Sequence, residues 1–89
     1  MKVKDFKPTE FSPHARLRMA ERGATEAEVE QAIREGSRLP VRSGRFECRL
    51  NLPYNGTWQG KVYAVKQVVA LVVEEPDRFV VVTVYTFYF

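Results

Sequence analysis

Residues 12–36 read SPHARLRMAERGATEAEVEQAIREG, and this stretch decides the first half of the fold. Ser12 is a residue type that caps helix N-termini, and Pro13 suits the first helical position because no backbone donor is needed there. No helix-breaking residue follows until Gly23, which can take the left-handed conformation that ends many helices. The pattern predicts a helix over residues 13–22.

A second helix is predicted over residues 26–35. Thr25 and Glu28 form a capping box, in which each side chain bonds the backbone amide of the other residue. One apolar stripe along this helix comprises Val29, Ala32 and Ile33. Helices of about ten residues are marginal in water by themselves. We therefore expect residues 13–35 to form a helical hairpin that packs on the rest of the chain.

Residues 45–89 carry the alternation and turn signals of an antiparallel sheet. Polar and apolar side chains alternate over residues 45–52, which is typical of a half-buried strand. Pro53-Tyr54-Asn55-Gly56 favours a tight hairpin turn, and Glu75-Pro76-Asp77-Arg78 favours a second turn. The further strands predicted by these turns cover residues 58–65, 67–74 and 79–89. Alternatively, residues 58–74 form one long, bent strand.

The last predicted strand, residues 79–89, is apolar on both faces. One face would carry Phe79, Val81, Thr83, Tyr85, Phe87 and Phe89, and the other Val80, Val82, Val84, Thr86 and Tyr88. Such a strand is typical of a sheet that is covered on both sides, whereas two short helices cover only one. The second face therefore needs a partner, a ligand cleft or closure of the sheet on itself. The aromatic end of the strand favours an interaction surface, such as that of a homodimer.

These elements predict one α+β domain over residues 1–89. The helical hairpin is expected to pack on a three- to four-stranded antiparallel sheet. A chain of 89 residues supports a single core and leaves no room for a separate cofactor domain. The core predicted from the patterns consists of Met19, Val29, Ile33, Phe46, Cys48, Leu50, Val69, Leu71, Val73, Val80, Val82 and Val84.

Several functional classes are excluded by what the chain lacks. Cys48 and His14 are its single cysteine and histidine, so we expect no disulfide framework and no Cys- or His-rich metal site. Walker, GxGxxG, GxSxG and paired-carboxylate motifs are absent, and we predict neither a metal nor a cofactor. No apolar stretch reaches the length of a membrane span, and the start, MKVKDFKPTEF, lacks the apolar segment of a secretory signal. We expect a cytoplasmic protein that does not associate with membranes.

The formal net charge of +3 is distributed unevenly. Residues 1–66 hold 13 Lys and Arg against 8 Asp and Glu, whereas residues 67–89 hold one Arg against three acids. Nine of the 14 basic residues are arginine, whose planar fork suits phosphate. An anionic partner is one interpretation, and a solvated surface on a mildly basic protein is the other.

His14, Arg18 and Arg22 recur at every fourth position and share one side of the first predicted helix. This set suits a phosphodiester substrate, because histidine can transfer a proton near neutral pH and arginine can hold the phosphate and its transition-state charge. The alternative is a solvated polar side of the helix, with Ala15 and Met19 facing the core.

Three polar side chains stand out among the apolar strand residues. Lys66 can project onto a sheet face or lie at a turn or edge. The hydroxyls of Thr83 and Tyr85 need partners if they are buried, or these residues serve simply as good strand formers. Trp58 and Tyr63 can stack on bases, although packing in the core is the simpler interpretation.

The segment SPHARLRMAERG, residues 12–23, resembles the opening helix of domain-of-unknown-function family 4258, whose pattern is roughly S-x-H-A-x-x-R-M-x-E-R-G. The Thr-x-x-Glu start of the second helix resembles that family too. So do Lys66-Gln67-Val68 and the ending Val82-Thr83-Val84-Tyr85 with Phe89. The resemblance covers residues 11–89, which is nearly the whole chain.

That family is similar to the barnase–EndoU–colicin–RelE group of small ribonucleases and toxins. The resemblance implies a curved antiparallel sheet and metal-independent cleavage of RNA on its face. Because the chain offers no convincing protein nucleophile, we expect the ribose 2′-hydroxyl to attack the adjacent phosphate. The candidate catalytic residues that the resemblance carries over are His14, Arg18, Arg22 and Tyr85, and the candidate substrate-binding residues are Lys66 and Thr83. The same analogy implies an antitoxin-like partner. The alternative function is a non-catalytic module of this fold that binds nucleic acid or a protein.

Overall fold

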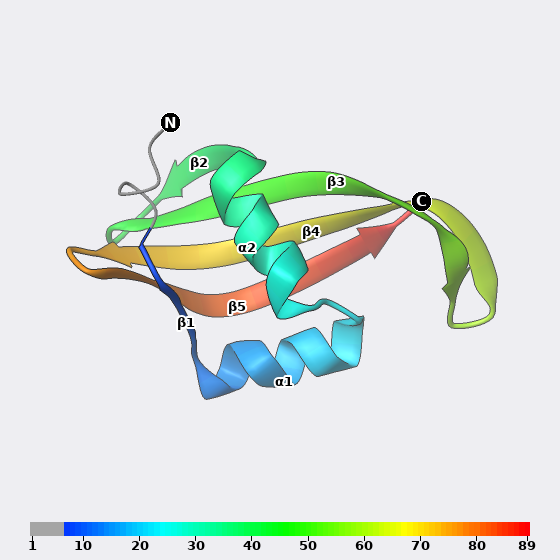
Figure 1. Cartoon of the computed structure of the whole chain (residues 1–89), viewed down its shortest axis with the longest axis horizontal. Helices are drawn as coiled ribbons and strands as arrows, with labels where there is room; N and C mark the ends of the chain where they lie inside the picture. The colour runs from blue at the N-terminus through cyan, green and yellow to red at the C-terminus, as the bar shows by residue number, and fades with distance from the viewer. Residues whose placement is uncertain (1–6) are drawn as a thin grey trace.

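The computed structural model describes residues 7–89. Residues 1–6 lie outside the described residues. They form part of the predicted domain 1–89 and of the start in which no secretory signal is predicted. Two helices lie against one five-stranded sheet with the strand order β1–β5–β4–β3–β2 (Figure 1). The helices are α1 (Pro13–Arg22) and α2 (Glu26–Glu35), and the strands are β1 (Thr9–Phe11), β2 (Ser37–Val41), β3 (Arg45–Trp58), β4 (Lys61–Glu75) and β5 (Arg78–Tyr88). The predicted α+β class is confirmed. Neither helix is long and apolar enough to cross a membrane in the part of the chain described.

Both helices begin and end where the capping residues predict. The Ser12 hydroxyl accepts a hydrogen bond from the Ala15 amide at 3.0 Å. The capping box is complete, because the Thr25 hydroxyl accepts from the Glu28 amide and the Glu28 carboxylate accepts from the Thr25 amide. Gly23 ends α1 with a φ of 78°, in the left-handed region. Caps are local interactions, and local sequence predicts them well.

The predicted packing of the two helices as a hairpin is wrong. Helix α1 packs along β5, whereas α2 crosses β3 and β4 (Figure 1). An ion pair between Arg16 and Glu26 links the helices at the surface. Each helix buries its own apolar stripe against the sheet, Ala15 and Met19 from α1 and Val29, Ala32 and Ile33 from α2. Because the apolar stripe of each helix is buried against the sheet, neither stripe is left to pack on the other helix. The sheet therefore determines how the two helices are oriented.

The sheet is mixed and five-stranded, which corrects the prediction of three to four antiparallel strands. Strands β2 to β5 pair antiparallel in sequence order, and β1 adds a short parallel pairing to β5. The sequence patterns missed β1 because it has three residues, and β2 because all five of its residues are exposed. Pro40 lies in β2, where the missing amide hydrogen is tolerated because β2 is an edge strand.

Strands β3 and β4 form one long hairpin. The chain turns at Gln59–Gly60, between the paired residues Trp58 and Lys61. The turn predicted at residues 53–56 is wrong, because those residues form a β-bulge inside β3. Asn55 has a φ of 47° there, so the Asn-Gly signal marks a left-handed residue in a bulge. The alternative of one bent strand over residues 58–74 is close to the observed β4.

A second bulge, in β5, changes which of its residues face the helices. Leu71 pairs with Thr83 but Val72 pairs with Val81, so Val82 is the extra residue. Up to the bulge Phe79 and Val81 face the core, and after it Val84 does. Under the helices the core also takes Val68, Ala70 and Val72 from β4, which corrects the predicted Leu71 and Val73. The predicted Val69 is confirmed as buried, with 2% of its surface exposed, although it lies on the opposite face of the sheet. The predicted Val80 and Val82 are likewise replaced by Phe79 and Val81. Met19, Val29, Ile33, Cys48 and Val84 are confirmed as core, with Phe46 and Leu50 packed against it.

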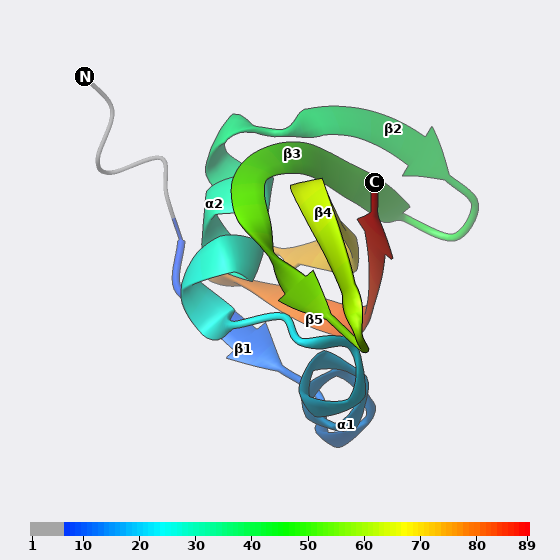
Figure 2. The same ribbon diagram turned by 90° about the vertical axis from the view of Figure 1, so that its right-hand side faces the viewer.

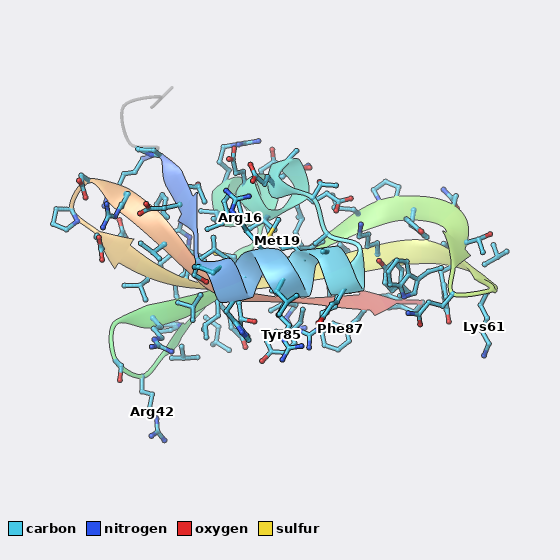
Figure 3. The ribbon with its side chains drawn as sticks, turned by 90° about the horizontal axis from the view of Figure 1, so that it is seen from below. Arg16, Met19, Arg42, Lys61, Tyr85 and Phe87 are labelled. Atoms are coloured by element: carbon cyan, nitrogen blue, oxygen red, sulfur yellow. The ribbon has the colours of Figure 1, made fainter. Side chains whose placement is uncertain are left out.

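The helices leave one face of the curved sheet uncovered, and we call it the open face (Figure 2). It carries the residues whose side chains alternate with the core residues. These are Arg45, Glu47, Arg49 and Asn51 of β3, Gln67, Val69 and Leu71 of β4, and Thr83, Tyr85 and Phe87 of β5. In Figure 3, Tyr85 and Phe87 point away from the side on which Arg16 and Met19 lie.

Gly23 provides a test of this packing. A Cβ atom built there would lie 2.7 Å from Cζ3 of Trp58 and 2.9 Å from the Tyr88 hydroxyl oxygen. Gly44 has a similar φ of 72°, but a Cβ there meets nothing within 4 Å. Left-handed backbone costs a non-glycine residue about 1–2 kcal/mol at either position, and overpacking adds about 1–3 kcal/mol at Gly23. Urea unfolding should show Gly23→Ala to be the more destabilising substitution by that added amount. Equal losses in the two variants would contradict the contact with the β3–β4 hairpin.

Candidate functional site

The C-terminal end of α1 is tied to the sheet by three long-range hydrogen bonds. The Arg22 carbonyl accepts hydrogen bonds from the Thr86 and Tyr88 hydroxyls, each at 2.8 Å. The Gly23 carbonyl accepts one from the Lys66 ammonium. Carbonyls at a helix end have no partner within the helix, so these side chains satisfy them. The ties hold Arg22 beside the outer edge of β5.

Lys66 lies on the helix side of the sheet, away from the open face. Its side chain is buried, and Nζ lies 2.7 Å from a carboxylate oxygen of Glu28. The rings of Tyr54 and Tyr88 lie 5.8 and 6.0 Å from Nζ, close enough for cation–π attraction. The structure therefore does not bring Lys66 to the other five predicted site residues, because its ammonium is already engaged in packing α1 and α2 on the sheet.

Arg22 and Tyr85 meet at the border between α1 and the open face. The Arg22 Nη1 atom donates to the Val84 carbonyl at 2.7 Å. The centre of its guanidinium lies 4.8 Å from the centroid of the Tyr85 ring. Because a guanidinium carries five N–H donors in a planar fork, the remaining donors can bind an anion while the group stays on the ring. The sequence named both residues, and the structure shows them in contact.

Thr83 and Tyr85 lie on the open face, two residues apart on β5. Thr83 is buried, whereas Tyr85 and Phe87 are 44% and 48% exposed. Val69 lies opposite Tyr85 in the register and is itself buried. In several RNA-binding folds, unpaired bases stack on half-exposed aromatic rings that project from the face of a sheet.

His14 and Arg18 lie on the flank of α1 that is next to the open face. Successive helical residues turn by about 100°, so with Ala15 facing the core, Arg16 lies on one flank and His14 and Arg18 on the other. The Arg16 flank faces α2, through the ion pair with Glu26. In Figure 3 Arg16 lies on the side of the sheet opposite to Tyr85. His14 is exposed, and Arg18 makes a surface ion pair with Glu21 at 2.8 Å, which is weak and can exchange for a ligand.

Trp58 and Tyr63 lie with the helix-side aromatic residues and away from the open face. Trp58 stacks on Tyr88 with 4.9 Å between the ring centroids, and Tyr63 lies 5.8 Å from the same ring. Burial raises the pKa of Tyr88, so its hydroxyl keeps the proton that it donates to α1. Trp58 and Tyr63 thus pack against Tyr88, whose hydroxyl binds the Arg22 carbonyl. This agrees with the interpretation that they are packing residues and do not stack on bases.

Cys48 is buried in the core, and desolvation raises the pKa of its thiol. A thiol held in its neutral form is a poor nucleophile, so Cys48 is a packing residue. Residues 7–89 contain no group of three His, Cys, Asp or Glu side chains placed to hold a metal ion.

A polar row on β3 and β4 was not singled out from the sequence. Arg49 Nη1 donates to Gln67 at 2.6 Å, and the Gln67 amide donates to Asn51 at 2.7 Å. Arg49 also lies 3.4 Å from a carboxylate oxygen of Glu47. The alternation over residues 45–52 predicts a polar face for this strand, but only the register shows that this face continues into Tyr85 through Val69.

Comparison with known proteins identifies a family without a described activity. The family model described as "Domain of unknown function (DUF4258)" matches residues 11–86. No curated protein and no solved structure matches the chain.

The placement of Lys66 generates a prediction. Lys66→Met keeps the aliphatic packing but leaves the Gly23 carbonyl without its donor and Glu28 without its counter-ion. Removing one partner of a buried ion pair costs about 3–5 kcal/mol, and we expect about 2–3 kcal/mol here because Glu28 reaches water. Denaturant unfolding measures the loss, and Lys61→Ala at the exposed start of β4 serves as the control with no loss. If Lys66→Met is as stable as the wild-type protein, the ammonium does not contribute to stability through Glu28 and the Gly23 carbonyl, which would contradict this placement.

Proposed function

Because the family model covers most of its length, the chain belongs to the DUF4258 family, and we propose that it binds single-stranded RNA on its open face and cleaves it without a metal ion. The observation that carries this proposal is the contact between Arg22 and Tyr85. It joins a phosphate-binding cation to a half-exposed phenol, at the point where the α1 flank with His14 and Arg18 meets the sheet. We take the protein to be cytoplasmic and, by analogy with its family, akin to the small ribonuclease toxins.

Binding would combine stacking with phosphate contacts. Tyr85 and Phe87 offer two neighbouring rings on β5, and stacking on an aromatic side chain is worth about 1–3 kcal/mol per base. Arg22 lies over the first ring and Arg49 lies two strands away in the same register row. A strand of RNA laid on these rings would place its phosphates within reach of the arginines.

Cleavage would use the ribose 2′-hydroxyl as the nucleophile. His14 takes the 2′-hydroxyl proton, the 2′-oxygen bonds to phosphorus, and the bond from phosphorus to the 5′-oxygen breaks. Tyr85 gives a proton to the leaving 5′-oxygen, and Thr83 helps to position the strand. His14 and Arg22 lie about 12 Å apart along the helix axis, with Arg18 about 6 Å from each. The scissile phosphate would therefore lie beside Arg18, where Arg18 and Arg22 stabilise its charge.

The aromatic end of β5, at the border of the open face, also favours a second role as a protein interface. Phe87 and Phe89 are 48% and 56% exposed in the isolated chain, and exposed aromatic side chains of this size are typical of interaction surfaces. An antitoxin-like inhibitor or a second copy of the chain would bind there and compete with RNA. Light scattering of the purified protein, alone and with RNA, tests for the second copy. If the protein stays monomeric at high concentration, the proposal of a homodimer is excluded.

A cleavage assay in EDTA tests the function. The substrate is an end-labelled single-stranded RNA, and a copy with one 2′-deoxynucleotide at the cleavage position should resist the enzyme. We expect His14→Ala and Tyr85→Phe each to lower the rate by about 10²–10⁴-fold, the usual contribution of one acid or base. Arg22→Lys should also lose activity, because lysine cannot reproduce the planar fork.

Tyr63→Phe is the matched control, because it removes the same hydroxyl from the helix side and should keep full activity. Loss of activity in EDTA with recovery on addition of a divalent ion would contradict the metal-free scheme. Tight binding of RNA by the wild-type protein without any cleavage would favour the non-catalytic module instead.

A further inference from the structure

A shallow, open hollow lies beside the β2–β3 turn. It has a volume of about 380 Å³ and is lined by Val41, Arg42, Ser43, Arg45 and Leu71. Arg45 and Leu71 belong to the open face. Arg42 points to the same side of the molecule as Tyr85 and Phe87 (Figure 3). The hollow therefore opens on the side where the proposed RNA site lies.

The two arginines of this hollow are without an acidic partner. Among residues 7–89, neither Arg42 nor Arg45 makes an ion pair or a side-chain hydrogen bond. Other surface arginines are paired, as Arg16 is with Glu26 and Arg78 with Glu10. Two guanidiniums that flank one concavity repel each other, and an anion bound between them attracts both and offsets that repulsion. Phosphate is the anion that the fork of arginine fits best.

The hollow is continuous with the candidate site. Leu71, which lines it, pairs across the sheet with Thr83, and Thr83 is followed two residues later by Tyr85. Arg45 lies four residues before Arg49, which shares a register row with Tyr85. Four residues along a strand and two strands across it correspond to about 13 Å and about 10 Å, or about 16 Å on the diagonal.

We propose that this hollow is a second phosphate-binding subsite, so that RNA runs diagonally across the open face from the β2–β3 turn to Tyr85 and Phe87. This inference rests on the proposed function and adds the size of its substrate. Tyr85 and Phe87 are two residues apart on β5, so a strand whose bases stack on both rings advances by about 7 Å per nucleotide, and about two to three nucleotides separate the two ends of the path. The substrate is then a single strand of at least about three to four nucleotides, and a dinucleotide reaches only one end.

The experiment measures RNA affinity by fluorescence anisotropy over a range of salt concentrations. The probe is a labelled 12-nucleotide single-stranded RNA, with His14→Ala as the common background to prevent cleavage. Each lost phosphate contact lowers the salt slope by about 0.7 for a single strand, which corresponds to about 5-fold in affinity at 0.1 M salt. We expect Arg42→Ala with Arg45→Ala to weaken binding by about 25-fold and to reduce the slope by about 1.4. A dinucleotide RNA, titrated at higher concentration, should lose less than about 2-fold, because it cannot reach both ends of the path.

Arg16→Ala with Lys61→Ala is the matched control, because it removes the same two charges from residues outside the hollow and the proposed RNA path. If this control weakens 12-nucleotide binding as much as the double variant in the hollow, the effect is one of net charge and the subsite is overturned. If the parent protein binds RNA but the hollow variant binds equally well, the subsite fails while the proposed function stands. If the parent protein binds no RNA, both fail together.

Discussion

The two carbonyl groups at the end of α1 are the point on which the rest of the structure depends. A helix end leaves its last carbonyls without partners, and here Thr86 and Tyr88 bind that of Arg22 while Lys66 binds that of Gly23. These bonds hold α1 along β5 and send the chain across the sheet into α2. They also set the Arg22 guanidinium on the Tyr85 ring. The constraint that assembles the fold is therefore the constraint that builds the candidate site.

Local sequence signals predicted the exact bounds of both helices. Which face of each strand turns to the core depends instead on how the strands pair. Ser12, Gly23 and the capping box act within a few residues, so the sequence contains them whole. In β5 both faces are apolar, and hydrophobic alternation gives no reason to prefer either. The extra residue Val82 then shifts the pattern by one, which only the pairing with β4 reveals. The Asn-Gly signal was likewise real but marked a bulge, because β3 continues past it to Trp58.

The candidate site was predictable as a set of residues and less so as a surface. Five of the six proposed residues lie on or beside the open face, and Lys66 differs because its ammonium faces Glu28 on the other side of the sheet. The spacing of His14, Arg18 and Arg22 placed them on one helix flank, but the ion pair of Arg16 shows which way that flank faces. The arginine hollow could not be predicted, since β2 carries no buried residue to mark it.

Mapping the RNA contact by NMR tests the central claim, that RNA binds the open face, most directly. A 12-nucleotide single-stranded RNA is titrated into isotope-labelled His14→Ala protein, and backbone amide and aromatic side-chain shifts are followed. The account predicts shifts in Tyr85, Phe87 and Arg49 with little change in the exposed residues of α2, which lies behind the sheet. Shifts gathered on α2, or none at saturating RNA, would contradict it.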